Sequence, residues 1–143
     1  MNKKLTICYL SYQRIPLLLK NLNLLINWLK NYKYKSFINI YIFDNNSDDF
    51  GTLQNFVNQN TDKVDCLKLY SSKINKGFPS NLTRAINGVE SYYTWLFSDD
   101  DFINFSEISS LLDKSLKYHI LFHSCESAIN QLNTCVVYKV INN

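Results

Sequence analysis

Three consecutive carboxylates, Asp99, Asp100 and Asp101, are the residues of this sequence best suited to chemistry. They follow an apolar, β-forming run over 93–97, which predicts a buried strand that ends in a negatively charged loop. Adjacent negative charges repel, so such a loop needs full solvation, facing helix N-termini or a bound cation. Mg²⁺ and Mn²⁺ prefer oxygen ligands and often keep waters that substrate phosphates replace. The stretch therefore predicts either a metal–phosphate site or a solvated loop whose carboxylates cap the next helix.

Three further polar segments also follow β-forming runs. They are Ser11–Arg14 after 5–10, Asp44–Asp49 after 37–43, and Asn75–Phe78 after 64–70. If the strands are parallel, their carboxyl ends meet at one edge of a sheet, where ligands bind in open α/β folds. Four polar loops at one edge favour a ligand site over four separate solvated loops.

Helical periodicity between the strands supports that arrangement. Apolar residues at helical spacing predict helices over 16–32 and 52–59, another that starts at Pro79, and one that follows an N-cap at Ser106. Shorter β-like runs at 119–123 and 134–141 predict two more strands. Strands that alternate with helices indicate parallel βαβ units, so the predicted fold class is α/β, a mainly parallel sheet flanked by helices.

Composition restricts the function classes. The 143 residues, 46% of them hydrophobic, are enough for one domain over 1–143. The net charge of +3 is spread over scattered lysines, which argues against nucleic-acid binding. The four cysteines are far apart and form no CxxC pair, which excludes zinc-ribbon and thioredoxin motifs. No signal peptide and no long apolar run are evident, so a cytoplasmic location is expected.

Common nucleotide motifs are missing. The sequence contains neither GxGxxG nor a Walker A loop, which argues against a classical NAD-binding or P-loop site. A phosphorylation-receiver domain would also gather carboxylates around Mg²⁺, but it would require a late lysine at a loop, and Lys139 lies in a β-like run.

Four motifs together carry a resemblance to the GT-A glycosyltransferases, specifically to the nucleotide-binding half of glycosyltransferase family 2. Thr6–Arg14 resembles the family's first strand and its Pro-Thr-Tyr-Asn-Arg turn, with Leu10, Ser11 and Gln13 as departures. The segment 42–49 is similar to the family's Val-Asp-Asp-Gly-Ser-Thr-Asp loop. Asn75-Lys76-Gly77-Phe78 resembles Asn-Arg-Gly-Phe, although Thr83 and Ala85 stand where Asn and Gly are common, and Ser98–Asp101 resembles a DxD-type motif. The motifs cover residues 4 to 115.

The resemblance implies a Rossmann-like GT-A nucleotide-diphospho-sugar transferase fold and a donor site. Asp44 would bind the base edge, Ser11, Tyr12 and Arg14 would line the base and ribose pocket, and Asp99 would approach the ribose or sugar. The implied set of nucleotide-sugar-binding residues is Ser11, Tyr12, Arg14, Asp44, Asn75, Gly77 and Asp99. Asp100 and Asp101 would hold Mn²⁺ or Mg²⁺ against the diphosphate, and which of the two is the ligand stays open.

The implied reaction is transfer of a sugar, with a UDP-sugar as the expected donor, to a glycan, bacterial polysaccharide or lipid-linked saccharide acceptor. Peripheral association with the inner face of a membrane is compatible with such an acceptor. The family continues well past this length with an acceptor-binding half and a general base, so the chain is expected to be truncated. Glu126 is a candidate base, with a surface loop residue as the alternative. The alternative function is a catalytically incompetent nucleotide-binding module or remnant. Donor sugar and oligomeric state stay open.

Overall fold

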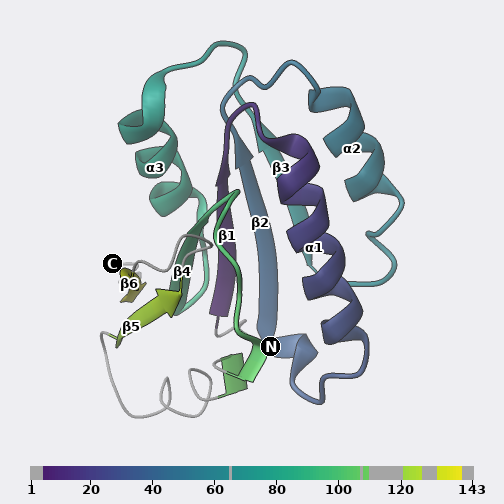
Figure 1. Cartoon of the computed structure of the whole chain (residues 1–143), viewed down its shortest axis with the longest axis vertical. Helices are drawn as coiled ribbons and strands as arrows, with labels where there is room; N and C mark the ends of the chain where they lie inside the picture. The colour runs from purple at the N-terminus through teal and green to yellow at the C-terminus, as the bar shows by residue number, and fades with distance from the viewer. Residues whose placement is uncertain (1–4, 65, 107, 110–120, 127–131, 140–143) are drawn as a thin grey trace.

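The computed structural model describes residues 5–64, 66–106, 108–109, 121–126 and 132–139. A six-stranded sheet with the order β3-β2-β1-β4-β6-β5 forms the centre of the molecule (Figure 1). The strands are β1 (Leu5–Ser11), β2 (Ile38–Asp44), β3 (Leu67–Ser71), β4 (Tyr93–Ser98), β5 (Leu121–Glu126) and β6 (Leu132–Lys139). This architecture confirms the predicted mainly parallel sheet flanked by helices.

The four strands before the acidic segment are parallel and in register. β1 pairs with both β2 and β4, and β2 pairs with β3. Ser11 is opposite Asp44, and Asp44 is opposite Ser71, so these strands end at one level. The carboxyl edge of the sheet therefore gathers the four polar loops, as the sequence pattern predicts.

The last two strands differ from the expected βαβ continuation. β6 runs antiparallel to β4, and β5 runs antiparallel to β6. Apolar periodicity identifies strands but carries no information on their direction, so the pattern could not distinguish a hairpin from parallel strands. A parallel sheet with an antiparallel edge is a common arrangement in α/β folds.

Helices cover both faces of the sheet. α1 (Ile15–Lys30) and α2 (Phe50–Asn58) lie on one face, and α3 (Gly77–Gly88) lies on the other (Figure 1). A 3₁₀ turn, η1 (Lys35–Phe37), leads into β2. Pro16 lies in the first turn of α1, where its missing N–H costs no helical hydrogen bond.

The alternation of side chains along β1 explains why it is central. Ile7 and Tyr9 pack against the α1 side, in the same cluster as Leu22, whereas Cys8 and Leu10 pack against the α3 side. A strand buried on both faces reads as a continuous apolar run, which is what the sequence shows. Full burial of one such side chain contributes about 1.5–3 kcal/mol, so this double-sided packing anchors β1 in the middle of the core.

Several element boundaries differ from the predicted ones. α3 starts at Gly77 and so contains Pro79 in its first turn. β3 starts at Leu67, and Val64 lies in a bend before it, so the predicted run 64–70 was wrong at its start. β5 ends at Glu126 and β6 starts at Leu132, which shifts both strands relative to 119–123 and 134–141.

The segment after the acidic loop is described only in part. Helical residues are found at 105–106 and 108–109, so the helical turn begins before Ser106, which is therefore not its N-cap. The remainder of that predicted helix lies outside the described residues. Among the helices that the structure describes, none combines the length and apolarity needed to cross a bilayer.

Candidate functional site

The loops at the carboxyl edge of the sheet surround a cavity of about 460 Å³, here called the strand-end cavity. It brings together six of the seven residues implied to bind a nucleotide-sugar. These are Ser11, Tyr12, Arg14, Asn75, Gly77 and Asp99. The remaining member, Asp44, does not line the cavity.

The turn after β1 is tied to the loop after β2. Gln13 adopts a left-handed conformation, with φ of 63°, and its N–H donates to Ser47 Oγ at 2.8 Å. The N–H of Asp48 in turn donates to Gln13 Oε1 at 3.3 Å. These two bonds keep the β1 turn open toward the cavity, where Tyr12 is 44% exposed.

Asp44 organises its own loop. Its side chain is fully buried, and its carboxylate accepts hydrogen bonds from the Ser47 N–H at 2.9 Å and from the Ser47 hydroxyl. Asn46 between them has a φ of 69°, which an Asn tolerates better than most residues. In this arrangement the carboxylate stabilises the 45–49 turn, and its implied contact with a base stays a prediction.

Two asparagines connect the loops after β2 and β3. Asn45 Nδ2 donates to Asn75 Oδ1 at 2.6 Å, and Asn45 Oδ1 accepts from the Lys76 N–H at 3.2 Å. The Gly77 N–H also donates to Asn75 Oδ1, at 2.8 Å. Asn75 therefore holds the start of α3 against the cavity. The sequence reasoning missed Asn45, although its place in the loop after β2 was a signal.

Asn81 and Arg84 hold the body of α3 to the strand ends. Asn81 Nδ2 donates to the Phe43 carbonyl at 2.8 Å, and Arg84 donates to the Asp44 carbonyl at 2.7 Å and to Ser72 Oγ at 2.8 Å. Burial lowers the pKa of the Arg84 guanidinium. Sequence reasoning also missed Asn81, which lines the cavity together with Leu10, Phe78 and Ser98.

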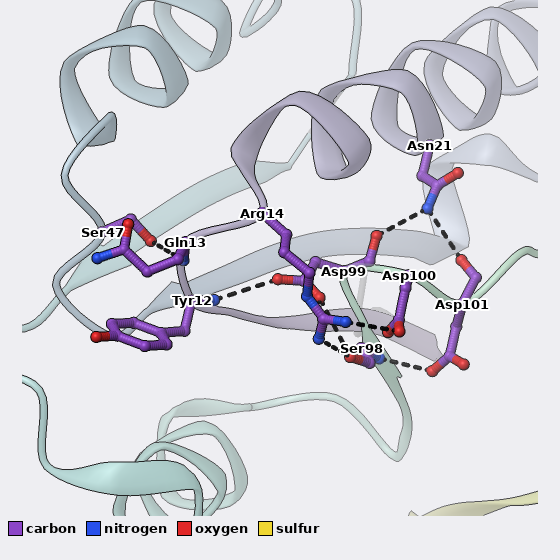
Figure 2. A network of polar contacts seen from close by, with 9 residues as sticks. All are labelled: Tyr12, Gln13, Arg14, Asn21, Ser47, Ser98, Asp99, Asp100 and Asp101. Carbon is purple, nitrogen blue, oxygen red and sulfur yellow. Dashed lines mark hydrogen bonds and ion pairs between the residues drawn. The ribbon is translucent and has the colours of Figure 1, made fainter.

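The acidic loop, Asp99–Asp101, lies beside the turn after β1 (Figure 2). Arg14 Nη2 is 2.6 Å from Asp99 Oδ1, and Arg14 Nη1 is 2.7 Å from Asp100 Oδ2. The Tyr12 N–H donates to Asp99 Oδ2 at 3.3 Å. The guanidinium thus faces the acidic loop as well as the cavity, so it neutralises part of the charge gathered there.

The three carboxylates have different environments. Asp101 Oδ2 accepts the Ser98 N–H at 2.7 Å, and burial together with the neighbouring Asp100 and Asp99 charges raises the Asp101 pKa. The pKa of Asp100 is lowered, first by a hydrogen bond with Ser98 and then by Arg14. The side chain of Asp100 is 42% exposed, and Asp101 is more deeply buried, so solvent reaches Asp100 more readily.

Asn21 on α1 holds the acidic loop through two of its backbone carbonyls. Its Nδ2 donates to the carbonyl oxygens of Asp99 and Asp101 at 3.0 and 3.1 Å (Figure 2). Sequence reasoning missed Asn21, although it is the one polar residue on the buried face of α1. A polar residue on an apolar helix face was the available signal, since buried amides require partners.

The carboxylates of the acidic loop fit a divalent cation only if substrate phosphates and water supply its remaining ligands. Within the described part of the chain, no three His, Cys, Asp or Glu side chains are arranged to hold a metal ion. Mg²⁺ commonly binds one or two carboxylates and completes its shell with substrate phosphates and water. Asp100 suits that role, while Asp101 already accepts a backbone N–H.

Glu126, the candidate base, is the last residue of β5 and pairs with Leu132 of β6. It therefore ends a strand, whereas the sequence reasoning put it in a loop after one. Because β6 runs antiparallel to β4, with Trp95 opposite Val137 and Tyr93 opposite Lys139, the Leu132 end of the hairpin points toward the carboxyl end of β4.

Comparisons with known proteins agree with this geometry. A family model described as Glycosyl transferase family 2 matches residues 6–129. No curated protein matches the sequence. Among solved structures, S. aureus TarS 1–349 in complex with UDP-GlcNAc has a TM-score of 0.68 at 22% identity, covering 82% of this chain and 32% of that one.

A second similar structure is the mannosyltransferase PcManGT from Pyrobaculum calidifontis in complex with GDP-Man and Mn²⁺. It has a TM-score of 0.65 at 14% identity, covering 82% of this chain and 33% of that one. The chain thus spans about a third of the length of these structures. Identities this low establish likeness of fold.

Proposed function

This chain belongs to glycosyl transferase family 2, and from that premise we propose that the strand-end cavity binds a nucleotide-diphosphate-sugar and that the protein transfers the sugar to a saccharide acceptor. The fold is the Rossmann-like GT-A fold, with a parallel four-stranded portion flanked by helices as in the similar structures.

One observation carries the proposal. Six residues implied to bind the donor come from three separate loops, and all of them line a single cavity. A cavity of about 460 Å³ lies within the range of small-molecule sites. Convergent polar groups in a cavity at the carboxyl edge of a parallel sheet are what a nucleotide requires.

We assign the two ends of the cavity to different parts of the donor. Tyr12 and Phe78 offer exposed aromatic faces on which a base can stack. Asn45 and Asn75 also line the cavity and add amide groups to its wall. At the other end, Arg14 and the acidic loop suit the diphosphate and its cation. The expected donor is a UDP-sugar.

A divalent cation, Mn²⁺ or Mg²⁺, would be held by Asp100 together with diphosphate oxygens, with Asp101 as the second candidate. When bound, it would neutralise the negative charge that develops on the nucleoside diphosphate as it leaves. The contribution of the chain itself is to fix the acidic loop: Asn21 holds two of its carbonyls, and the Ser98 N–H holds Asp101. A preorganised loop of this kind needs little rearrangement to bind the donor.

We propose Glu126 as the general base that deprotonates an acceptor hydroxyl, because the β5–β6 register directs that end of the hairpin toward the carboxyl end of β4. The acceptor class proposed is a glycan or lipid-linked saccharide, met in the cytoplasm or at the inner face of the membrane. Loss of transfer with retained donor binding in Glu126→Gln is the expected result. Full transfer by that variant would remove Glu126 from the proposal.

Thermal shifts with a nucleotide panel test the donor class. UDP, GDP, ADP and CDP are each added with and without Mn²⁺, because a ligand that binds only the native state raises the melting temperature by mass action. We expect UDP with Mn²⁺ to give the largest shift and Asn75→Ala to reduce it. If no nucleotide moves the melting temperature, the strand-end cavity is not a donor site.

A further inference from the structure

Arg14 bridges two carboxylates that differ sharply in burial. Its Nη2 is 2.6 Å from Asp99 Oδ1 and its Nη1 is 2.7 Å from Asp100 Oδ2 (Figure 2). The side chain of Asp99 is 1% exposed, whereas those of Asp100 and Arg14 are 42% and 51% exposed. One guanidinium therefore has a buried partner and a solvent-exposed partner at the same time.

The two contacts respond differently to a competitor. An ion pair between exposed groups contributes little, because water and salt screen it and both side chains lose freedom to form it. A contact with a buried carboxylate is costly to break, because that negative charge is left without a counter-charge away from water. The Arg14–Asp100 contact is thus the one that can open while the Arg14–Asp99 contact persists.

Building on the proposed donor site, we propose that Arg14 is an exchangeable counter-cation of the acidic loop. It neutralises Asp100 before donor binds, yields Asp100 to a divalent cation when the donor arrives, and turns the released N–H groups of Nη1 to the donor diphosphate. Asp99 keeps the guanidinium in place throughout. Guanidinium N–H groups suit phosphate oxygens as well as carboxylates, so the same side chain serves both states.

Loss of the Arg14 guanidinium should therefore change cation binding and nucleotide binding in opposite directions. Arg14 and a divalent cation compete for the carboxylate of Asp100, so loss of the guanidinium should strengthen binding of the cation alone. The same loss removes a diphosphate contact, so it should weaken nucleotide binding. A residue that only supports the fold of the loop would weaken both when substituted.

Arg14→Gln tests this with two readouts on the full chain. Binding of Mn²⁺ alone is measured from the electron paramagnetic resonance signal of free Mn²⁺, and binding of UDP in the presence of Mn²⁺ by calorimetry. We expect Mn²⁺ alone to bind roughly two- to fivefold more tightly in Arg14→Gln, the range that the free energies of exposed ion pairs allow. UDP should bind several-fold more weakly.

Lys20→Gln is the matched control. Lys20 lies on α1, the helix that begins directly after Arg14, and its Nζ is 5.9 Å from the centre of the Phe102 ring, next to the acidic loop. The substitution removes the same unit of charge without breaking a contact to Asp99 or Asp100. A gain in Mn²⁺ affinity in Arg14→Gln that exceeds the gain in Lys20→Gln therefore reports direct competition and excludes a long-range charge effect.

Unchanged or weaker Mn²⁺ binding in Arg14→Gln, relative to Lys20→Gln, overturns the proposal. If Arg14→Gln does not fold, Arg14→Lys replaces it: lysine keeps the charge but lacks the planar fork, so a smaller gain of the same sign is expected and no gain contradicts the exchange. The Mn²⁺ measurement needs no nucleotide. Failure of wild-type protein to bind UDP would thus count against the donor site, and failure of the Mn²⁺ comparison against the exchange.

Discussion

The side-chain amide of Asn21 lies 3.0 Å from the carbonyl oxygen of Asp99. The contact joins the first helix to the loop after the fourth strand, and a second bond from the same amide reaches the Asp101 carbonyl. The acidic loop is therefore positioned by α1, the helix that directly follows the cavity-lining turn. This makes Asn21 the connection through which the core determines the geometry of the site.

Asn21→Ala should reduce UDP binding more than its effect on folding explains. Removal of the amide leaves two carbonyl oxygens without their donor, which costs about 1–3 kcal/mol of unfolding free energy. The loop also loses its fixed position, so calorimetry with Mn²⁺ should show weaker UDP binding at temperatures where the variant is fully folded.

Asn39→Ala serves as the control for Asn21→Ala. Asn39 is also buried and its Nδ2 donates to Thr6 Oγ1 at 3.2 Å, near the other end of the sheet. It should lower the unfolding free energy and leave UDP affinity unchanged. Equal losses of UDP affinity in both variants would show that Asn21 acts only through stability.

Gly77→Ala should destabilise the protein through the backbone. Gly77 has a φ of 78°, and an added Cβ would meet Pro79 Cδ at an ordinary 3.8 Å. The cost is thus the left-handed conformation, about 1–2 kcal/mol of unfolding free energy, and urea denaturation measures it. The start of α3 should shift as well, which weakens UDP binding.

Gly51→Ala is the comparison for Gly77→Ala, because it should change the unfolding free energy in the opposite direction. Gly51 lies in α2 with nothing within 4 Å of its added Cβ. Alanine is the better helix former by roughly 0.5–1 kcal/mol, so this variant should be as stable as wild type or more so. Equal destabilisation by both substitutions would contradict the role assigned to the left-handed turn.

The sequence predicted that the loops meet at one edge of the sheet, but it did not predict the side-chain contacts within those loops. Strand ends in register are enough to bring Ser11, Asn75 and Asp99 to one cavity. Asp44 was expected there too, but the Ser47 hydroxyl and N–H three residues later engage its carboxylate. Local side-chain pairing of this kind depends on loop conformation, which strand patterning does not determine.

The residues and strand directions that the sequence did not predict also depend on tertiary structure. Asn21 lies within the apolar pattern of α1, and a single polar residue in such a pattern does not indicate a function until its hydrogen-bond partners are known. Leu10 and Phe78 are apolar residues near the end of β1 and the start of α3, and their apolar character alone does not indicate that they line the cavity. The direction of β5 and β6 depends on tertiary pairing.

Asp101→Asn should be neutral or stabilising near neutral pH. Burial and neighbouring carboxylates raise the Asp101 pKa above its usual 3.8, so the folded state holds the proton more tightly than the unfolded state. Ionised Asp101 therefore opposes folding at neutral pH, and this effect fades as pH falls through the raised pKa. The amide oxygen can still accept the Ser98 N–H, so the stability gain should shrink on acidification.

Asp100→Asn should behave in the opposite way. The Asp100 pKa is lowered by Ser98 and Arg14, so its ionised form stabilises the fold above the usual pKa and this contribution is lost as pH falls through the lowered value. Melting temperatures are measured between pH 3 and 7. At neutral pH that of Asp101→Asn should be equal to or above the wild-type value and that of Asp100→Asn below it, and both should approach the wild-type value in acid. Parallel pH profiles would contradict the environments described for the two carboxylates.

Phe78→Ala should weaken UDP binding without lowering stability. Phe78 is 63% exposed and lines the strand-end cavity, so its ring contributes little to the core. Stacking on a base is worth about 1–3 kcal/mol, which corresponds to a loss of affinity from several-fold to over a hundredfold. Ile74→Ala is the control, since Ile74 is 59% exposed in the loop that precedes α3 and does not line that cavity. Equal effects of the two substitutions would remove Phe78 from the site.

Calorimetric titration of UDP into the full chain, with Mn²⁺ and then with the cation chelated, is the most direct test of the central claim that the strand-end cavity is a nucleotide-diphosphate site. We expect one UDP to bind per chain, and we expect the affinity for UDP to fall when the cation is chelated. Asp100→Ala should bind UDP more weakly than wild type in the presence of Mn²⁺, and chelation should not weaken its binding any more. Absence of UDP binding under both conditions, or binding that neither chelation nor Asp100→Ala affects, would contradict it.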